Sequence, residues 1–329
     1  MRDSQSTLEL TGVSPRGPTR LPLASLSHRG GAAMKFGYMC MNSAYGIRPA
    51  RLAAELEQRG FDSFWVPEHS HIPVDRTSPF ITGGELPEGY LHMMHPMVSL
   101  ASAASATTRL KLGTGVCLLL QHTLPDLAMQ TATLDVVSDG RLEFGVGVGW
   151  NAEELADHRP ELPFRQRYSA MRERIDALRT IWRDEIASFE GKYEKLSSSW
   201  VYPKPVRGRI PILLGNFGPV GIAHAAACAD EWMPIDHMLK GTDGKPDVAG
   251  RIGEFRAELE KNGRDPSTVP ISLFMFSRPT PDRIERYAAL GVHRLIVSPP
   301  HANLQDADFT LRHLDDLDNI VRDFGAAVG

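Results

Sequence analysis

The feature that most constrains the fold is a regular alternation of strand-like and helix-like segments that begins at Met34. Short apolar runs predict strands, and longer runs with apolar residues at helical spacing predict the helices between them. The predicted strands are 35–40, 61–66, 110–120, 141–149, 211–215, 230–234, 269–276 and 292–299. The predicted helices are 48–60, 96–108, 124–138, 164–184, 218–228, 248–262, 280–291 and 308–325.

Repeated strand–helix units predict parallel strands joined by right-handed crossovers. Eight units in one domain of about 295 residues fit a (β/α)8 TIM barrel with insertions, and a doubly wound open sheet is the alternative. Both folds place ligands beyond the C-terminal ends of the strands. Three polar segments interrupt the alternation. We interpret 188–209 as a hairpin or surface loop, and we expect 67–95 and 236–247 to line the substrate pocket.

The first 33 residues lack this periodicity and are rich in Pro, Ser, Gly and Arg. We predict that 1–33 is disordered or precedes the true start at Met34, and that 34–329 forms one domain. With 36 basic and 40 acidic residues, the chain offers no general attraction for nucleic acid or a membrane surface. No apolar run approaches the ~20 residues that span a bilayer. Three cysteines without paired spacing predict reduced thiols in a cytoplasmic protein; they are Cys40, Cys117 and Cys228.

The segment after the second strand brings together Glu68, His69 and His71. A His-x-His pair at a barrel strand end can chelate a divalent metal, as in metal-dependent hydrolases, but such a site needs further ligands on other strands. The fourth and fifth strands end in glycine or Gly-Asn instead. A polar contact with a bound organic cofactor is therefore favoured over a metal site or ordinary loop positions.

The fourth strand carries the run Gly145-Val-Gly147-Val-Gly149. Its spacing differs from the dinucleotide fingerprint, and its glycines lie within the strand rather than in the following turn. Glycine at every second position leaves one strand face bare, so that a ligand ring or a large neighbouring side chain can approach the backbone. The run 215–219, Gly-Asn-Phe-Gly-Pro, opens a helix whose N-terminus can bind a phosphate, and an ordinary turn is the alternative.

Taken in order, these motifs resemble the luciferase-like monooxygenase superfamily, and more closely its branch that uses the deazaflavin coenzyme F420. The matching segments are 60–73, 107–121, 127–154, 167–182, 202–206 and 211–216. The resemblance implies a barrel with the cofactor at the strand C-termini, and catalytic residues Glu68 and His69 facing the reacting ring. It implies a cis peptide bulge behind that ring and glycines that clear space for it. The implied cofactor contacts are Gly115, Val116, Gly147, Gly149, Trp150, Asn151, Glu153, Gly215, Asn216, Phe217 and Gly218.

The function that follows is an F420-dependent oxidoreductase that transfers a hydride between deazaflavin C5 and a small organic substrate. His69 is the expected proton donor or acceptor, and Glu153 is expected to orient it or to contact the cofactor. Some relatives carry a catalytic Glu where this chain has Trp150, which argues against a sugar-phosphate dehydrogenase. Asn216 replaces a second glycine near the expected phosphate.

Three alternatives stay open. The first is an FMN-dependent monooxygenase that works with a separate reductase. The second is a metal-dependent barrel hydrolase, and the third is an inactive flavin-binding protein. Relatives of this kind are often homodimers. Candidate substrate contacts in the two inserted segments are Tyr90, Met93, Met94, Asp236 and His237.

Overall fold

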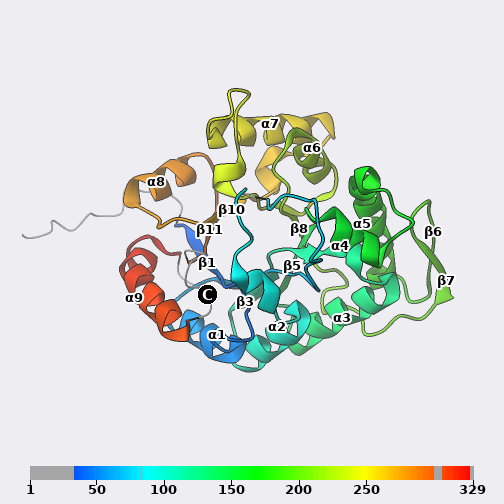
Figure 1. Cartoon of the computed structure of the whole chain (residues 1–329), viewed down its shortest axis with the longest axis horizontal. Coiled ribbons are helices and arrows are strands. Elements are labelled where there is room, and N and C mark those ends of the chain that lie inside the picture. The colour runs from blue at the N-terminus through cyan, green and yellow to red at the C-terminus, as the bar shows by residue number, and fades with distance from the viewer. Residues whose placement is uncertain (1–32, 82, 300–305, 327–329) are drawn as a thin grey trace, which may run out of the picture. The chain divides into compact units, whose positions relative to one another are not determined.

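In the computed structural model, which describes residues 33–81, 83–299 and 306–326, eight parallel strands form a nearly closed barrel surrounded by helices (Figure 1). Their order around the barrel is β10-β11-β1-β2-β3-β5-β8-β9. The strands are β1 (Lys35–Met39), β2 (Ser63–Val66), β3 (Lys111–Thr114), β5 (Leu142–Gly147), β8 (Ile212–Leu214), β9 (Glu231–Trp232), β10 (Ser272–Met275) and β11 (Arg294–Val297).

Two backbone hydrogen bonds join the ends of this strand order. The Trp232 N–H donates to the Pro270 carbonyl over 3.1 Å, and the Phe274 N–H donates to the Pro234 carbonyl over 2.9 Å. These bonds connect β9 with β10, so the predicted barrel is confirmed and the open-sheet alternative is wrong. All eight predicted strands are present, although several are shorter than expected.

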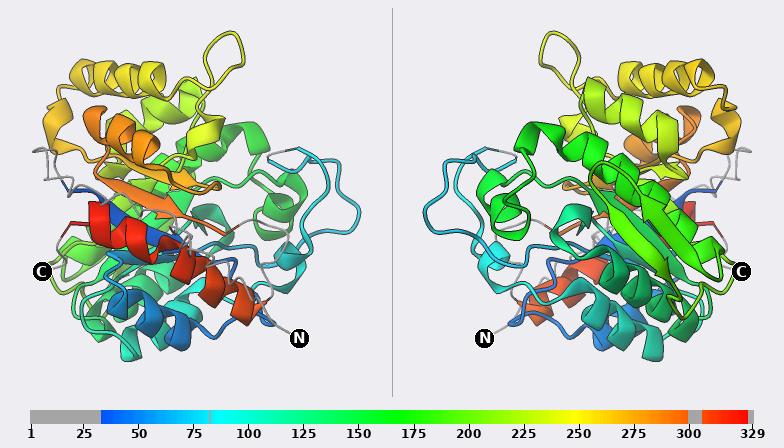
Figure 2. Two further views of the ribbon diagram at one scale, coloured as in Figure 1. Left: turned by 90° about the vertical axis from the view of Figure 1, so that its left-hand side faces the viewer. Right: turned by 90° about the vertical axis from the view of Figure 1, so that its right-hand side faces the viewer.

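The helices of the described residues lie outside the barrel (Figures 1 and 2). They are α1 (Pro49–Gln58), α2 (Pro96–Ser105), α3 (Leu124–Val137), α4 (Ala152–His158), α5 (Arg167–Arg183), α6 (Pro219–Cys228), α7 (Val248–Lys261), α8 (Pro281–Ala289) and α9 (Ala307–Phe324). Proline occupies one of the first two positions of α1, α2, α3, α6 and α8, where its missing N–H costs no helical hydrogen bond. Short 3-10 turns span Glu88–His92, Leu119–Gln121, Phe164–Gln166, Asp236–Met238 and Pro266–Thr268.

Two local differences separate the structure from the sequence prediction, and one local expectation is confirmed. The predicted strand 110–120 breaks at a cis peptide between Gly115 and Val116 and resumes as β4 (Cys117–Leu118), which pairs with β5. Helix α4 directly after β5 was not predicted as an element. The segment 188–209 contains an antiparallel hairpin, β6 (Ala187–Glu190) with β7 (Lys195–Ser199), as expected.

The predicted domain boundary falls largely on residues 1–32, which lie outside the described residues, so that division stays a prediction. Within the described part of the chain, none of the helices combines the length and apolar character needed to cross a bilayer. The three cysteines are free thiols, two of them buried.

The barrel interior is filled by a compact apolar cluster that is separate from the larger core between strands and helices. Its buried members are Met39, Trp65, Leu213, Met233, Phe274 and Ile296. These side chains come from six different strands or strand ends, so the interior is a packed core. Trp65 is fully buried, and its indole N–H donates to the Ser63 hydroxyl over 2.8 Å, which satisfies the polar atom of the largest side chain in the cluster.

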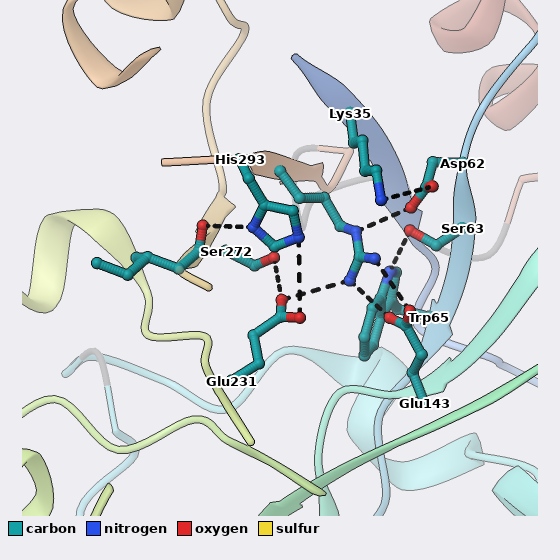
Figure 3. A network of polar contacts seen from close by, with 10 residues as sticks. Lys35, Asp62, Ser63, Trp65, Glu143, Glu231, Ser272 and His293 are labelled. Carbon is teal, nitrogen blue, oxygen red and sulfur yellow. Dashed lines mark hydrogen bonds and ion pairs between the residues drawn. The ribbon is translucent and has the colours of Figure 1, made fainter. Parts of the chain in front are cut away.

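An ionic network, which we call the floor network, closes the N-terminal end of the barrel (Figure 3). At its centre is Arg294, the first residue of β11, which is 2% exposed. Its guanidinium donates to Asp62 over 2.8 Å and to Glu143 over 2.6 Å, and it lies 3.4 Å from Glu231. Ser272 donates a further hydrogen bond to Glu231. One buried guanidinium therefore faces three carboxyl groups.

Candidate active site

The C-terminal ends of β2, β3, β5 and β8 and the residues that follow them include every residue that the sequence singled out as catalytic or cofactor-binding. Because the strands are parallel, these ends meet at one mouth of the barrel, opposite the floor network. Most of the segment 67–95 forms a long loop at one side of the barrel, drawn in cyan in Figure 2. The structure thus brings the predicted site residues to one end of the fold.

His69 is held between two side chains from the start of α4. Its Nδ1 lies 2.7 Å from a Glu154 carboxylate oxygen, and the indole N–H of Trp150 donates to its Nε2 over 3.2 Å. An indole nitrogen can only donate, so Nε2 must be an acceptor and the ring proton must lie on Nδ1, which donates to Glu154. The contacts therefore define His69 as a neutral imidazole with its accepting nitrogen turned toward Trp150.

Aromatic rings surround His69 on the side of the inserted segment. The rings of Tyr90 and Trp150 each lie 5.5 Å from the imidazole, measured between centroids. Phe80 packs edge-to-face against both of them, at 5.1 Å and 5.7 Å. Burial raises the pKa of Tyr90 to about 12, so its hydroxyl stays protonated near neutral pH. Tyr90 was a candidate substrate contact, and the structure places it next to His69.

The two consecutive acidic residues of α4 have different roles. Glu154 is fully buried and bonds His69, whereas the carboxylate of Glu153 accepts the backbone N–H and hydroxyl of Thr77 over 2.7 and 2.8 Å, and lies 3.3 Å from the Ser78 N–H. Hydrogen bonds from Ser78 and Thr77 lower the pKa of Glu153 to about 2. The expectation that Glu153 orients His69 is wrong, because neighbouring helical residues point about 100° apart. Its contact with a cofactor stays a prediction.

Glu68 supports the strand ends. It is 5% exposed, and its carboxylate accepts the Leu118 N–H over 2.7 Å and the His122 Nε2–H over 2.9 Å. Burial alone would raise the pKa of Glu68, but these bonds and one from the Cys117 thiol hold it below its usual range. Both carboxylate oxygens are thus engaged by the segment that follows the cis peptide, and the catalytic role expected for Glu68 stays a prediction.

The glycines of β5 make room for protein atoms. A Cβ added to Gly147 would lie 2.6 Å from a Val116 methyl carbon, and one added to Gly215 would lie 2.8 Å from the other Val116 methyl. A Cβ on Gly145 would collide with the Thr114 carbonyl. At Gly145 and Gly147 the Cβ side faces protein atoms, which fits the alternative of a large neighbouring group. The contact of Gly147 with a cofactor stays a prediction. The glycines let the Gly115–Val116 bulge, predicted as cis and found so, sit between β5 and β8.

The turn after β8 leaves the N-terminus of α6 uncapped. Gly218 is its N-cap, no side chain caps the helix, and a Cβ added there would meet nothing within 4 Å. Asn216 is buried, and its carbonyl accepts the Trp232 indole N–H over 2.7 Å. Phe217 packs against the outer core. Free N–H groups at an uncapped helix start suit an anion, so the arrangement fits the expected phosphate, and the assignment stays a prediction.

Buried polar atoms without a partner gather at this mouth. Six such atoms follow strand ends: Asn42 Oδ1, Gln121 Oε1, Asn151 Nδ2, Glu153 Oε2, Glu154 Oε1 and Asn216 Nδ2. Buried polar groups are nearly always hydrogen-bonded, so a concentration of unpaired donors and acceptors at one end of the barrel indicates a polar ligand. Asn151 also caps α4, because its Oδ1 accepts the Glu154 N–H over 3.2 Å. Gly149, with φ +74°, forms the turn before it.

The residues that could bind a metal ion differ from the expected His69 and His71 pair. His69 is bonded to Glu154, and His71 lies 3.0 Å from Asp157 on the surface, so the His-x-His pair does not form a site. Each of Glu68, His95 and His122 instead offers one ligand atom, all within 4.8 Å of one another. In this structure the bond between Glu68 and His122 occupies two of those atoms, which favours a structural role over a metal centre.

The inserted segment 236–247 contributes less than expected. Asp236 is buried, and its carboxylate accepts hydrogen bonds from Arg283 and from the Tyr287 hydroxyl. It therefore anchors the segment to α8 and is not free for substrate. His237 is 44% exposed beside it.

Comparison with known proteins agrees with this architecture. The sequence profile of the family described as "Luciferase-like monooxygenase" matches residues 34–319, and the chain belongs to this family. An uncharacterized protein of Mycobacterium tuberculosis is 36% identical over 284 residues, which cover 83% of this chain and 95% of that protein.

Relatives with described activities are more distant. An F420-dependent glucose-6-phosphate dehydrogenase of Amycolatopsis mediterranei is 28% identical over 200 residues, which cover 60% of this chain and 56% of the dehydrogenase. An F420-dependent secondary alcohol dehydrogenase, solved with an F420–acetone adduct, superposes with a TM-score of 0.68 at 17% identity and covers 89% of this chain and 100% of that chain. The chain is therefore a luciferase-like oxidoreductase of the α/β barrel type.

Proposed function

We propose that this protein is an F420-dependent oxidoreductase that interconverts a small alcohol and its carbonyl compound. The observation that carries the proposal is the hydrogen-bonded chain Trp150–His69–Glu154 at the barrel mouth. The F420-dependent relatives, the uncapped start of α6 and the unpaired polar atoms around the mouth support the choice of cofactor. When bound, the deazaflavin would accept or return a hydride at C5.

The protein's own contribution would be proton transfer and orientation. In the oxidation direction, the substrate carbon loses a hydride and its hydroxyl loses a proton, so that a carbonyl forms. His69 Nε2 is the acceptor for that proton, and the Glu154 carboxylate stabilises the imidazolium that results. Trp150 must release Nε2 for this step, and its N–H is then free to donate to the substrate oxygen. Phe80 and Tyr90 exclude water from the same side.

Cofactor choice is tested by following the fluorescence of F420 and of FMN during titration with purified protein. We expect saturable binding of F420 and none of FMN. Turnover is then followed as loss of F420 absorbance with 2-propanol and longer secondary alcohols. His69→Gln should retain F420 binding but lose most of the turnover, whereas His71→Gln, the same substitution at the surface histidine beside Asp157, should retain both. Unchanged turnover in His69→Gln would show that the imidazole takes no part in the chemistry.

The family description specifically favours one further candidate, an FMN-dependent monooxygenase that receives reduced flavin from a separate reductase. FMN binding without F420 binding selects that activity. If the protein binds neither F420 nor FMN but contains stoichiometric zinc, the result favours the metal-dependent hydrolase, with Glu68, His95 and His122 as the metal ligands. Binding of cofactor with no turnover is the expected result for an inactive flavin-binding protein.

We further propose that the protein acts as a homodimer in the cytoplasm on a small-molecule substrate, without nucleic-acid or membrane partners. Light scattering after size-exclusion chromatography tests the dimer, and a mass of one chain would contradict it.

A further inference from the structure

An arginine-rich cavity of about 340 Å³ lies far from the barrel mouth. Its lining residues come from the end of α5, from the loop before β8 and from the residue before β9: Arg179, Trp182, Arg183, Arg207, Gly208, Arg209, Ile210 and Asp230. Since β8 begins at Ile212 and β9 at Glu231, the cavity opens at the N-terminal end of the strands. It is separate from the site around His69, and its volume is within the range of small-ligand pockets.

The positive charges of this cavity are only partly neutralised. Arg179 pairs with Asp230 over 3.1 Å, and Arg183 pairs with Asp184 over 2.7 Å. Asp230 also accepts the Ile212 N–H over 2.9 Å, which fixes it to the strand.

Two further arginines remain. Among the residues that the structure describes, Arg207 and Arg209 have neither a hydrogen bond nor an ion pair. The cavity lining thus contains four arginines and one carboxylate, that of Asp230, while Asp184 lies beside Arg183 and the Asp135 carboxyl group interacts with the charge of Arg207.

A helix C-terminus gives one ordinary reason for nearby cations, because its last carbonyls attract them. That role is already filled at α5, where the Lys204 ammonium donates to the carbonyls of Ile181 and Asp184 over 2.7 and 2.6 Å. Capping of α5 therefore does not explain Arg207 and Arg209. Both side chains line the cavity, and Gly208 between them has φ +67°, a conformation that glycine adopts without strain.

The cavity floor is apolar. Trp182 and Ile210 are each 2% exposed, and the Trp182 indole N–H donates a hydrogen bond to the Ala128 carbonyl over 3.3 Å. A doubly charged anionic group matches an arginine rim of this kind. Guanidinium groups bind phosphate oxygens in pairs of parallel hydrogen bonds.

We propose that this cavity is a binding site for a dianionic phosphate group, held mainly by Arg207 and Arg209. The site is independent of the cofactor site at α6 and of the reaction at His69. Inorganic phosphate and small phosphate monoesters both carry the group that this site would bind. An acidic surface of another protein is the competing occupant, and the experiment must distinguish it from phosphate.

The test is isothermal titration of the full-length protein with inorganic phosphate and with phenyl phosphate at constant ionic strength. We expect saturable binding of both ligands with similar affinity, because Trp182 and Ile210 are almost completely covered by protein and the phosphate group makes the main contacts. The double variant Arg207→Ala/Arg209→Ala should weaken this binding at least tenfold. Arg322→Ala, in which an exposed arginine paired with Asp323 is removed, should bind phosphate as the wild type does.

Circular dichroism and the urea unfolding midpoint show whether the double variant is folded. If it does not fold, the single variants Arg207→Lys and Arg209→Lys replace it, and each should weaken binding because lysine lacks the paired donors. Equal phosphate affinity of the wild type and a folded variant overturns the proposal. The absence of saturable phosphate binding by the wild type up to about 10 mM also overturns it. Phosphate bound only through the α6 site would survive the double variant and would also overturn it.

Discussion

Replacement of Glu231 by glutamine should change how the stability of this protein depends on pH. Glu231 is buried in the floor network beside Glu143 and Asp62, and only Arg294 supplies a buried positive charge. Burial, opposed by Arg294 but reinforced by the two neighbouring carboxylates, raises the pKa of Glu231 from 4.5 to about 7. The folded protein therefore keeps a proton on this carboxyl group that the unfolded chain has already released.

The magnitude follows from linkage between proton binding and folding. Between pH 4.5 and about 7 the folded state binds more protons than the unfolded state, so stability falls as pH rises. At about 1.4 kcal/mol for each pH unit, the contribution present below pH 4.5 and lost above pH 7 is about 3 kcal/mol. Glutamine has the shape of the protonated carboxyl group and does not titrate, so the variant should not lose this contribution.

A neighbouring histidine acts in the opposite direction. His293 Nδ1 donates to the Ile271 carbonyl over 3.0 Å, and its Nε2 lies 3.8 Å from Glu231. Burial first, and then the charge of Arg294, lowers the pKa of His293 to about 4. The folded state therefore resists protonation, and stability falls as pH drops from 6.5 toward 4. Its side chain is 30% exposed, so solvent screening makes this contribution smaller than that of Glu231.

The assay is urea unfolding followed by tryptophan fluorescence between pH 5.0 and 7.5, with the free energy of unfolding extrapolated to water. The quantity of interest is the free energy of unfolding of Glu231→Gln minus that of the wild type at each pH. It should become more favourable to the variant by about 2–3 kcal/mol as pH rises across this range. Glu260→Gln, at an exposed position of α7, measures the effect of removing a surface carboxylate. A Glu231→Gln difference that stays constant within 0.5 kcal/mol (about the additivity error of such measurements) would refute the reasoning.

Three further predictions concern the barrel mouth. Glu154→Gln should lower kcat by about 10²-fold in the F420 absorbance assay while F420 affinity is retained, and a loss confined to KM would contradict a role for Glu154 in proton transfer. Gly147→Ala should destabilise the protein by about 1–3 kcal/mol in urea, because the new methyl meets Val116, and Val116→Ala in the same chain should restore most of the loss. Glu153→Gln should increase proteolytic cleavage within 67–95, since the carboxylate holds Thr77, and an unchanged cleavage rate would assign that loop's order to other contacts.

The strand–helix alternation was sufficient to predict the barrel because each unit is local and amphipathic. The same pattern could not reveal where the chain bends within a unit. Residues 110–120 are mostly apolar and contain no proline or polar run that marks a break. The break after Gly115 depends on Val116 fitting between Gly147 of β5 and Gly215 after β8. The sequence did show that one face of the fourth strand lacks side chains, but it did not show whether a ligand or a side chain fills the space there.

The partner of His69 was missed for a different reason. Glu153 and Glu154 are adjacent, and the first helical residue of α4 decides which of them points into the barrel. The cap by Asn151 sets that helical phase, and a cap preceding two acidic residues is a usable signal in retrospect. The floor network was missed because Arg294 and Glu143 are 151 positions apart, and pairings of that length cannot be read from local pattern.

The filled interior and the floor network give the barrel a single open end. Trp65, Phe274 and the groups around Arg294 block any passage along the barrel axis. Two ligands that meet at His69 must therefore enter and leave through the same mouth. If the proposed cofactor and substrate stack there, the one that lies deeper has to bind first and leave last, which predicts a compulsory order of binding. Steady-state product-inhibition patterns would then have the form of an ordered mechanism, set by the plugged axis.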